Sequence, residues 1–205
     1  MADDPIIHVI DDDESLRSAL LSLLASVGFA GRGHASVSDF LAAERPDAPG
    51  CLVLDVRMPG MNGLDMQDRF DELGIAQPAV LMSGHGDIPM SVRAMKAGAV
   101  DFLVKPFRDQ DLLDAVTAAV AQDRKRRAQA VDDAELRRRH ASLSPREQQV
   151  MALVVAGQMN KQAAYALDLS EVTVKIHRGA AMRKMGARTL PDLVRMAERL
   201  ALLGQ

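Results

Sequence analysis

Cysteine is almost absent from this 205-residue chain, in which Cys51 is the only thiol. A single cysteine excludes a disulfide framework and any metal cluster built on several thiolates. Because Cys51 opens the apolar run 51–54, we expect it to be buried as a small hydrophobic residue. Apolar runs as long as a membrane span are also missing, and residues 1–5 lack the basic segment and apolar core of a secretory signal. The sequence therefore predicts a cytoplasmic protein with no membrane contact.

Aromatic residues are scarce, with no tryptophan and one tyrosine, which argues against recognition of single-stranded nucleic acid by base stacking. Charge, in contrast, is plentiful and unevenly spread. Net charges of −10, +3 and +4 over residues 1–120, 121–142 and 143–205 give the formal total of −3. An acidic first part joined to a basic last part favours two domains. This distribution indicates a cation-binding domain joined to a domain that binds polyanions.

Short apolar runs alternate with amphipathic stretches over the first 120 residues. The strands are expected at 6–10, 30–34, 51–55, 79–82 and 100–104. Helices are expected at about 14–26, 36–44, 64–73, 88–97 and 109–122. The run 30–34 contains few residues with high strand propensity, and we predict a strand there mainly from its position in the alternation. The pattern predicts an α/β domain over residues 1–122, with a flavodoxin-like five-stranded parallel sheet of order 2-1-3-4-5.

The remaining residues read as a helical linker followed by a small all-α domain of four helices. Residues 123–142 contain no Gly or Pro and carry two basic runs, which we interpret mainly as a solvated helix face. Within 143–205, Ser144, Pro145 and Glu147 form a helix-start signature, and Asn160 and Ser170 are candidate caps for the next two helices. The tight step 168–170 between short helices is typical of a helix-turn-helix.

Four polar elements of the first domain each follow a predicted strand: the triplet Asp11–Asp13, then Asp55, Ser83 and Lys105. Because parallel strands end at one edge of a sheet, these side chains should meet there. Clustered carboxylates require a divalent cation, and a carboxylate such as Asp55 can attack phosphorus to form an acyl phosphate. A hydroxyl and an ammonium would stabilise the phosphoryl oxygens. The set predicts a phosphoryl-accepting site.

Each of these residues also has a simpler interpretation. The Asp triplet could be a helix cap with a solvated acidic turn, Asp55 could be a surface acid in a turn, and Ser83 and Lys105 could belong to ordinary loops. We prefer the functional interpretation because independent surface residues would rarely all fall at the same strand edge.

The first domain resembles the receiver domain of bacterial two-component response regulators over residues 6–120. The motifs that carry the resemblance are 9–13, 54–63, 82–87 and 96–107. It implies that Asp55 is the phosphoacceptor and that Asp12 and Asp55, Asp11 through water, and the Arg57 carbonyl hold Mg²⁺ or Mn²⁺. It further implies that Ser83 and Lys105 hold the phosphoryl oxygens, that Phe102 is the switch aromatic, and that the Lys105–Pro106 bond is cis.

In the last domain, Val174, His177, Ala181 and Met185 recur at helical spacing and should face a small core. The opposite face carries cations, apolar residues and a small residue, which suits a DNA major groove, although a protein-binding bundle is equally compatible with the pattern. Segments 143–147, 157–161 and 170–178 resemble the LuxR/NarL-type DNA-binding domain, and the whole chain is similar to FixJ-type regulators. This resemblance implies base or groove contacts from Lys175, Ile176 and Gly179, and phosphate contacts from Lys161, Thr173, Arg178 and Lys184.

Together these features predict a response regulator of a two-component system. The expected partners are a sensor histidine kinase and double-stranded promoter DNA, with RNA polymerase as a candidate further partner and a homodimer forming on phosphorylation. We expect no enzyme activity beyond Mg-dependent self-phosphorylation and autodephosphorylation. An aspartate-nucleophile phosphatase is a rival hypothesis, weakened because no second acid stands two residues after Asp55. An interaction module whose basic domain binds protein is the other.

Overall fold

The computed structural model describes residues 4–84 and 88–203. The motif residues His85, Gly86 and Asp87 lie outside the described residues. The chain divides into two compact units, residues 1–127 and 128–205, and each is taken by itself below. None of the helices within the described ranges is long and apolar enough to cross a membrane.

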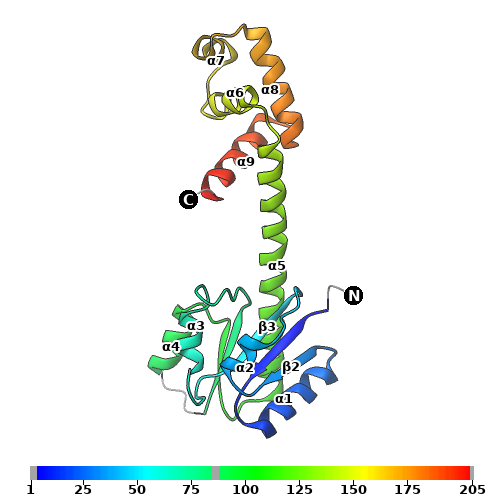
Figure 1. Cartoon of the computed structure of the whole chain (residues 1–205), viewed down its shortest axis with the longest axis vertical. Coiled ribbons are helices and arrows are strands. Elements are labelled where there is room, and N and C mark those ends of the chain that lie inside the picture. The colour runs from blue at the N-terminus through cyan, green and yellow to red at the C-terminus, as the bar shows by residue number, and fades with distance from the viewer. Residues whose placement is uncertain (1–3, 85–87, 204–205) are drawn as a thin grey trace. The chain divides into compact units, whose positions relative to one another are not determined.

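The first unit is built on a parallel sheet of five strands in the order β2-β1-β3-β4-β5, as Figure 1 shows in part. The strands are β1 (Ile6–Ile10), β2 (Ala30–His34), β3 (Gly50–Asp55), β4 (Ala79–Ser83) and β5 (Asp101–Val104). All four neighbouring pairs are parallel. The predicted flavodoxin-like order is confirmed, and β1 and β3 lie side by side in the middle of the sheet.

Five helices accompany the strands: α1 (Glu14–Ser26), α2 (Val37–Ala42), α3 (Gly63–Asp68), α4 (Ile88–Lys96) and α5 (Asp109–Ala141). Helix α1 has the predicted bounds. Helix α3 was expected to reach residue 73 but ends at Asp68, and residues 69–74 form hydrogen-bonded turns instead. Gly74, at φ +63°, ends these turns, and the Ile75 amide then bonds back to the Phe70 carbonyl.

Successive strand residues face opposite sides of the sheet and form two apolar layers. On one side, Ile7, Val9 and Val53 pack with residues of α1 and α5. On the other, Ile10 and Leu54 pack with residues of α2, α3 and α4. Cys51 is fully buried in the first layer, as expected. Both faces of the sheet are covered, and within it His8 of β1 and His34 of β2 form a buried, hydrogen-bonded pair.

The two glycines of β2 lie directly beneath side chains of α1. A Cβ atom on Gly31 would lie 2.6 Å from Leu21 Cδ2, and one on Gly33 would lie 3.1 Å from Arg17 Cδ. Helix α1 therefore packs directly on the backbone of this edge strand. The absence of a side chain at Gly31 and Gly33 leaves room for the Leu21 and Arg17 side chains to lie against this strand.

Helix α5 continues without interruption through the segment predicted as a linker. Asp123, fully buried, accepts hydrogen bonds from the Gly50 amide at 3.1 Å and from Arg126 and Arg127. Arg127 also pairs with Asp47. Asp123 thus ties α5 to the start of β3, and Arg127 ties it to the loop before that strand, whereas the sequence suggested a solvated face.

The second unit contains α6 (Pro145–Val155), α7 (Asn160–Leu167), α8 (Glu171–Met185) and α9 (Leu190–Leu203). The predicted capping box of Ser144 and Glu147 is present, and Ser170 caps α8 through the Thr173 amide. The predicted Asn160 cap is wrong: Met159 is the cap residue, and the Gln162 side chain accepts its amide.

The core of this unit explains the spacing seen in α8. Val174, Ala181 and Met185 are fully buried, and His177 is half-buried beside them. Met185 and Ala181 pack with Leu136 of α5, Met151 of α6 and Leu193 of α9. The end of α5 is therefore part of this core.

Candidate functional site

Three carboxylates and one ammonium meet at the carboxyl end of the central strands. The carboxylates belong to Asp11 and Asp12, directly after β1, and to Asp55, which ends β3, and their oxygens lie within 4.8 Å of one another. Lys105, directly after β5, places Nζ 2.7 Å from Asp11 Oδ2 and 2.9 Å from Asp55 Oδ2. Asp11 is fully buried and Asp55 is 7% exposed, whereas Asp12 faces solvent. Asp11, Asp12, Asp55 and Lys105 are thus gathered at one edge.

The residues of the Asp triplet have different structural roles. Asp13 caps α1 by accepting the amides of Ser15 and Leu16 at 2.9 and 3.1 Å. The Asp13 amide in turn donates to Asp11 Oδ1 at 2.9 Å. The simpler interpretation, a helix cap, is therefore correct for Asp13 and leaves Asp11 and Asp12 at the strand edge.

Arg17, in the first turns of α1, supports this loop and was missed by sequence reasoning. Its Nη1 donates to the Asp11 carbonyl at 2.6 Å, and its stem crosses the space left by Gly33. This contact fixes the backbone that carries the acids. The spacing from Asp13 to Arg17, one helical turn, places Arg17 over this loop, but nothing in the sequence distinguishes it from a surface arginine.

Asp55 is fixed by the loop that follows it. The Arg57 amide donates to Asp55 Oδ1 at 3.2 Å, and the Val56 amide and carbonyl bond to Met82 and Gly63. A Cβ atom on Gly63 would lie 2.3 Å from the Asp55 carbonyl oxygen. Gly63 is therefore required by close approach of two backbones, which the sequence did not reveal.

Ser83 and Phe102, which the resemblance implies as further site residues, lie on β4 and β5. Ser83 ends β4 and is fully buried, and its hydroxyl donates to Met90 Sδ of α4 at 3.6 Å. Phe102 is half-buried on β5 and packs against the layer formed with α2, α3 and α4. The Lys105–Pro106 peptide bond is cis.

The electrostatics of the cluster favour an ionised Lys105. Burial disfavours its charge, but hydrogen bonds to Asp11 and Asp55, together with their negative charges, outweigh that effect and raise the pKa of Lys105. One ammonium cannot balance three carboxylates, so about two negative charges remain. Carboxylate oxygens are the ligands that Mg²⁺ prefers. The donor set and its charge thus fit a hard divalent cation.

The second unit presents α8 as an exposed surface. Val172 and Ile176 are 69% and 63% exposed, and Lys175 and Arg183 are also exposed. Asp168, in the left-handed region at φ 54°, forms the step between α7 and α8. Exposed branched apolar side chains flanked by cations on one helix are suited to a groove whose base edges carry acceptors and methyl groups.

The predicted phosphate-contacting residues of this unit differ in how they are held. Lys161 is exposed, and Arg178 Nη1 donates to Asn160 Oδ1 at 3.3 Å. Thr173 bonds to the cap residue Ser170. Lys184 Nζ lies 2.7 Å from Glu147 Oε2 and 3.2 Å from the Ser142 carbonyl. Lys184 therefore already has two acceptors within its own unit.

Comparison with known proteins settles the family. The response regulator receiver domain family matches residues 7–117. The luxR family of bacterial regulatory proteins matches residues 141–197. The chain is a response regulator. Its second domain belongs to the LuxR-type DNA-binding domains. Neither the receiver family nor the LuxR family is a family of catalytic enzymes.

Relatives of this response regulator match it over nearly its whole length. Nodulation protein W of Bradyrhizobium diazoefficiens is 54% identical over 96% of this chain and 87% of its own length. The transcriptional regulatory protein FixJ of Rhizobium meliloti is 44% identical over 95% of each chain. Among solved structures, response regulator StyR gives a TM-score of 0.82 at 45% identity, covering 96% of this chain and 99% of its own. The predicted resemblance to FixJ-type regulators is confirmed.

Proposed function

We propose that this response regulator is a transcription regulator activated by phosphorylation of Asp55. The contact of Lys105 with both Asp11 and Asp55, beside the exposed Asp12, is the observation that carries the proposal. It joins a carboxylate nucleophile, a fixed cation and a solvent-facing metal ligand in one place. The phosphodonor is the phosphohistidine of a partner sensor histidine kinase.

In the proposed reaction, an Asp55 carboxylate oxygen attacks phosphorus while the nitrogen–phosphorus bond of the phosphohistidine breaks. Asp12, Asp55, the Arg57 carbonyl and, through water, Asp11 would hold Mg²⁺ or Mn²⁺. When bound, that ion supplies positive charge that offsets the carboxylates and the phosphoryl oxygens. Lys105 is already 2.9 Å from Asp55, so its ammonium can bind a phosphoryl oxygen with little movement. The Ser83 hydroxyl donates a hydrogen bond to another phosphoryl oxygen.

The added charge then changes the receiver surface. Recruitment of the Ser83 hydroxyl draws in the end of β4, and Phe102 shifts on the neighbouring strand β5. The face formed by α4, β5 and α5 would change shape and favour a homodimer. Ile88, Val92, Met95 and Val104 give this face exposed apolar side chains, between 44% and 79% exposed, that a second copy could cover.

The proposed output is binding of promoter DNA by paired α8 helices, at half-sites about one helical turn apart. Lys175, Ile176 and Gly179 would contact base edges, and Lys161, Thr173, Arg178 and Lys184 would contact phosphates. Because Lys184 is engaged by Glu147, we expect it to contribute least to the salt dependence of binding. RNA polymerase is a further partner in this proposal.

Phosphodonor-stimulated DNA binding by Asp55→Asn and wild-type protein tests the proposal. The wild type should show Mg-dependent phosphorylation, dimer formation and tighter, salt-sensitive retention on duplex DNA, since phosphate contacts release counterions. Asp55→Asn should lose all stimulation and keep only basal DNA binding. Stimulated DNA binding that survives in Asp55→Asn would contradict the proposal. Steady phosphate release from an ordinary phosphoester would favour the rival phosphatase.

A further inference from the structure

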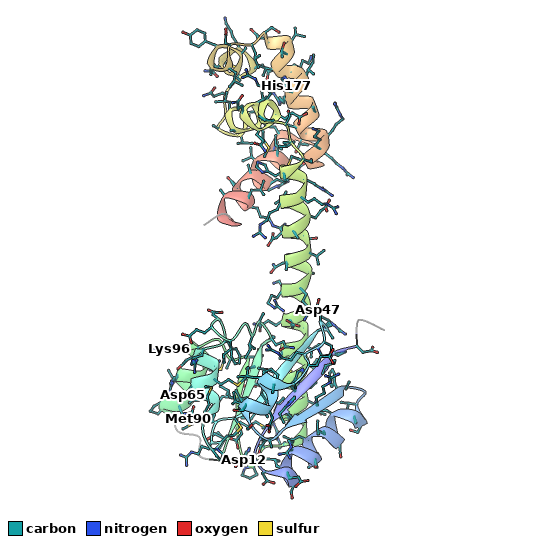
Figure 2. The ribbon with its side chains drawn as sticks, viewed as in Figure 1. Asp12, Asp47, Asp65, Met90, Lys96 and His177 are labelled. Atoms are coloured by element: carbon teal, nitrogen blue, oxygen red, sulfur yellow. The ribbon has the colours of Figure 1, made fainter. Side chains whose placement is uncertain are left out.

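The peptide group that joins Asp11 to Asp12 is held by a side chain of α1. Its carbonyl oxygen, which belongs to Asp11, accepts a hydrogen bond from Arg17 Nη1 at 2.6 Å. Because a peptide group is planar, the direction of this carbonyl also sets the direction in which the chain enters Asp12. Figure 2 labels Asp12 at the end of β1, where the residue is exposed. The Arg17 contact therefore constrains the backbone of the solvent-facing ligand of the candidate metal site.

The carboxylates of Asp11 and Asp12 are held to different degrees. The Asp11 amide donates to the His34 carbonyl at 3.2 Å. Both Asp11 carboxylate oxygens also accept bonds, Oδ1 from the Asp13 amide and Oδ2 from Lys105. Within the part of the chain that the structure describes, no hydrogen bond or ion pair holds the Asp12 side chain. The position of the Asp12 carboxylate therefore depends on the backbone that carries it.

A glycine of the neighbouring strand leaves room for the Arg17 side chain. A Cβ atom on Gly33 of β2 would lie 3.1 Å from Arg17 Cδ and 3.2 Å from Arg17 Cγ. Arg17 is half-buried, and among the described residues it forms no ion pair with a carboxylate. A stem packed against β2 thus directs the guanidinium at the Asp11 carbonyl, unlike an arginine on a solvated helix face.

We infer that Arg17 is a positioning residue for the metal site, which holds the peptide between Asp11 and Asp12 in the orientation that presents the Asp12 carboxylate to the cation. Gly33 serves the same purpose, because it leaves space for the Arg17 stem. The inference rests on the metal site of the proposed function and adds two residues that are not themselves ligands.

Loss of this contact should weaken the binding of Mg²⁺. Without the bond the peptide samples other orientations, and the apparent dissociation constant rises as the competent fraction falls. A hydrogen bond from a charged donor is strong enough to change such an equilibrium about tenfold. Removal of the Arg17 charge acts in the opposite direction, because a nearby cation opposes a divalent ion. Since the guanidinium contacts a carbonyl and not the carboxylates, this opposing effect is the smaller one, and we expect Arg17→Met to bind Mg²⁺ about fivefold more weakly.

The test is a calorimetric titration of the full, unphosphorylated chain with Mg²⁺. Arg17→Met should weaken binding about fivefold, whereas Arg32→Met, the matched control, should not weaken it. Arg32 of β2 also donates to a carbonyl, that of Glu44, at 2.9 Å. The control therefore removes the same charge and a similar bond, at a loop that carries none of the metal ligands.

Glycine variants of β2 test the same contact without a change of charge. Gly33→Ala should weaken Mg²⁺ binding about twofold, because its Cβ displaces the Arg17 stem by a few tenths of an ångström. Gly31→Ala, whose Cβ presses on Leu21 as that of Gly33→Ala does but not on Arg17, should leave the affinity unchanged. In an Arg17→Met background, Gly33→Ala should have no further effect, since the two residues act through one contact. Slow thiol labelling of buried Cys51 verifies that each variant is folded.

Two results would overturn the inference alone, with wild-type protein binding Mg²⁺. One is unchanged or tighter binding by Arg17→Met, which would leave Arg17 with only an electrostatic or a packing effect. The other is equal weakening by Arg17→Met and Arg32→Met, which would assign the loss to a general change in charge or stability. Absence of Mg²⁺ binding by the wild type would instead refute the metal site of the proposed function, and the inference with it.

Discussion

Removal of the Asp123 carboxylate should destabilise the receiver unit strongly. This side chain is fully buried and accepts hydrogen bonds from the Gly50 amide, Arg126 and Arg127. Asp123→Ala leaves the Gly50 amide without this acceptor and removes an ion-pair partner of Arg126 and of Arg127, which keeps Asp47. Breaking a buried ion pair typically costs about 3–5 kcal/mol. Because both arginines are partly exposed and can regain water, we expect the lower end of that range, about 3 kcal/mol.

The single thiol provides the assay. Cys51 is fully buried on β3, and burial, reinforced by the nearby Asp123 charge, raises its pKa to about 12. A thiol reagent can therefore label it only when the sheet opens. Where opening is rapid and reversible, a loss of 3 kcal/mol raises the labelling rate about 150-fold.

Asp114→Ala is the matched control, because Asp114 is exposed on the same helix. We expect it to change the labelling rate by less than about twofold. If Asp123→Ala were labelled at a rate within about threefold of the Asp114→Ala rate, the reasoning would be refuted. The buried carboxylate would then make little contribution to the stability of the sheet.

Three further outcomes are expected. Burial, then the charges of His34, Arg32 and Arg45, lowers the pKa of His8 to about 4 from 6.5. The unfolded chain therefore binds the extra proton first, and stability should fall by about 2–3 kcal/mol as the pH drops from 6.5 to 4. Urea unfolding followed by circular dichroism should show this slope, and His8→Gln should flatten it. Gly63→Ala should lower the stability measured by Cys51 labelling by about 2 kcal/mol, because its Cβ would clash with the Asp55 carbonyl. Gly84→Ala, with open space around it, should leave the labelling rate unchanged. Equal labelling rates in the two variants would contradict the argument. Lys105→Met should bind Mg²⁺ about tenfold more tightly in calorimetry, because a competing positive charge is removed; weaker binding would argue that Lys105 organises the ligands.

Local signals in the sequence were sufficient for most element boundaries. Helix α1 begins after its Asp13 cap and has the predicted limits, and α8 begins after the predicted Ser170 cap. Helix α3 lacks such a signal at its end and was predicted too long. The Asn160 cap was wrong because any polar residue before a helix suggests a cap, and only the backbone distinguishes Asn160 from Met159.

The acid cluster was predictable because strand ends of a parallel sheet converge, whatever the details of the loops. The supporting residues were not. Asp123 and Gly50 are 73 residues apart, Gly63 is required only because Asp55 passes close to it, and Met90 contacts Ser83 through a geometry set by α4. Such contacts depend on how elements pack together, and no local pattern encodes that packing.

The most direct test of the central claim is the site of phosphorylation. Purified protein would be incubated with Mg²⁺ and a small-molecule phosphodonor, and intact mass followed by peptide mapping would locate the modification. We predict a gain of one phosphoryl group, on the peptide that contains Asp55, which is absent in Asp55→Asn and slowed in Asp12→Asn. A phosphoryl group on any other residue, or no gain with the metal present, would contradict the account.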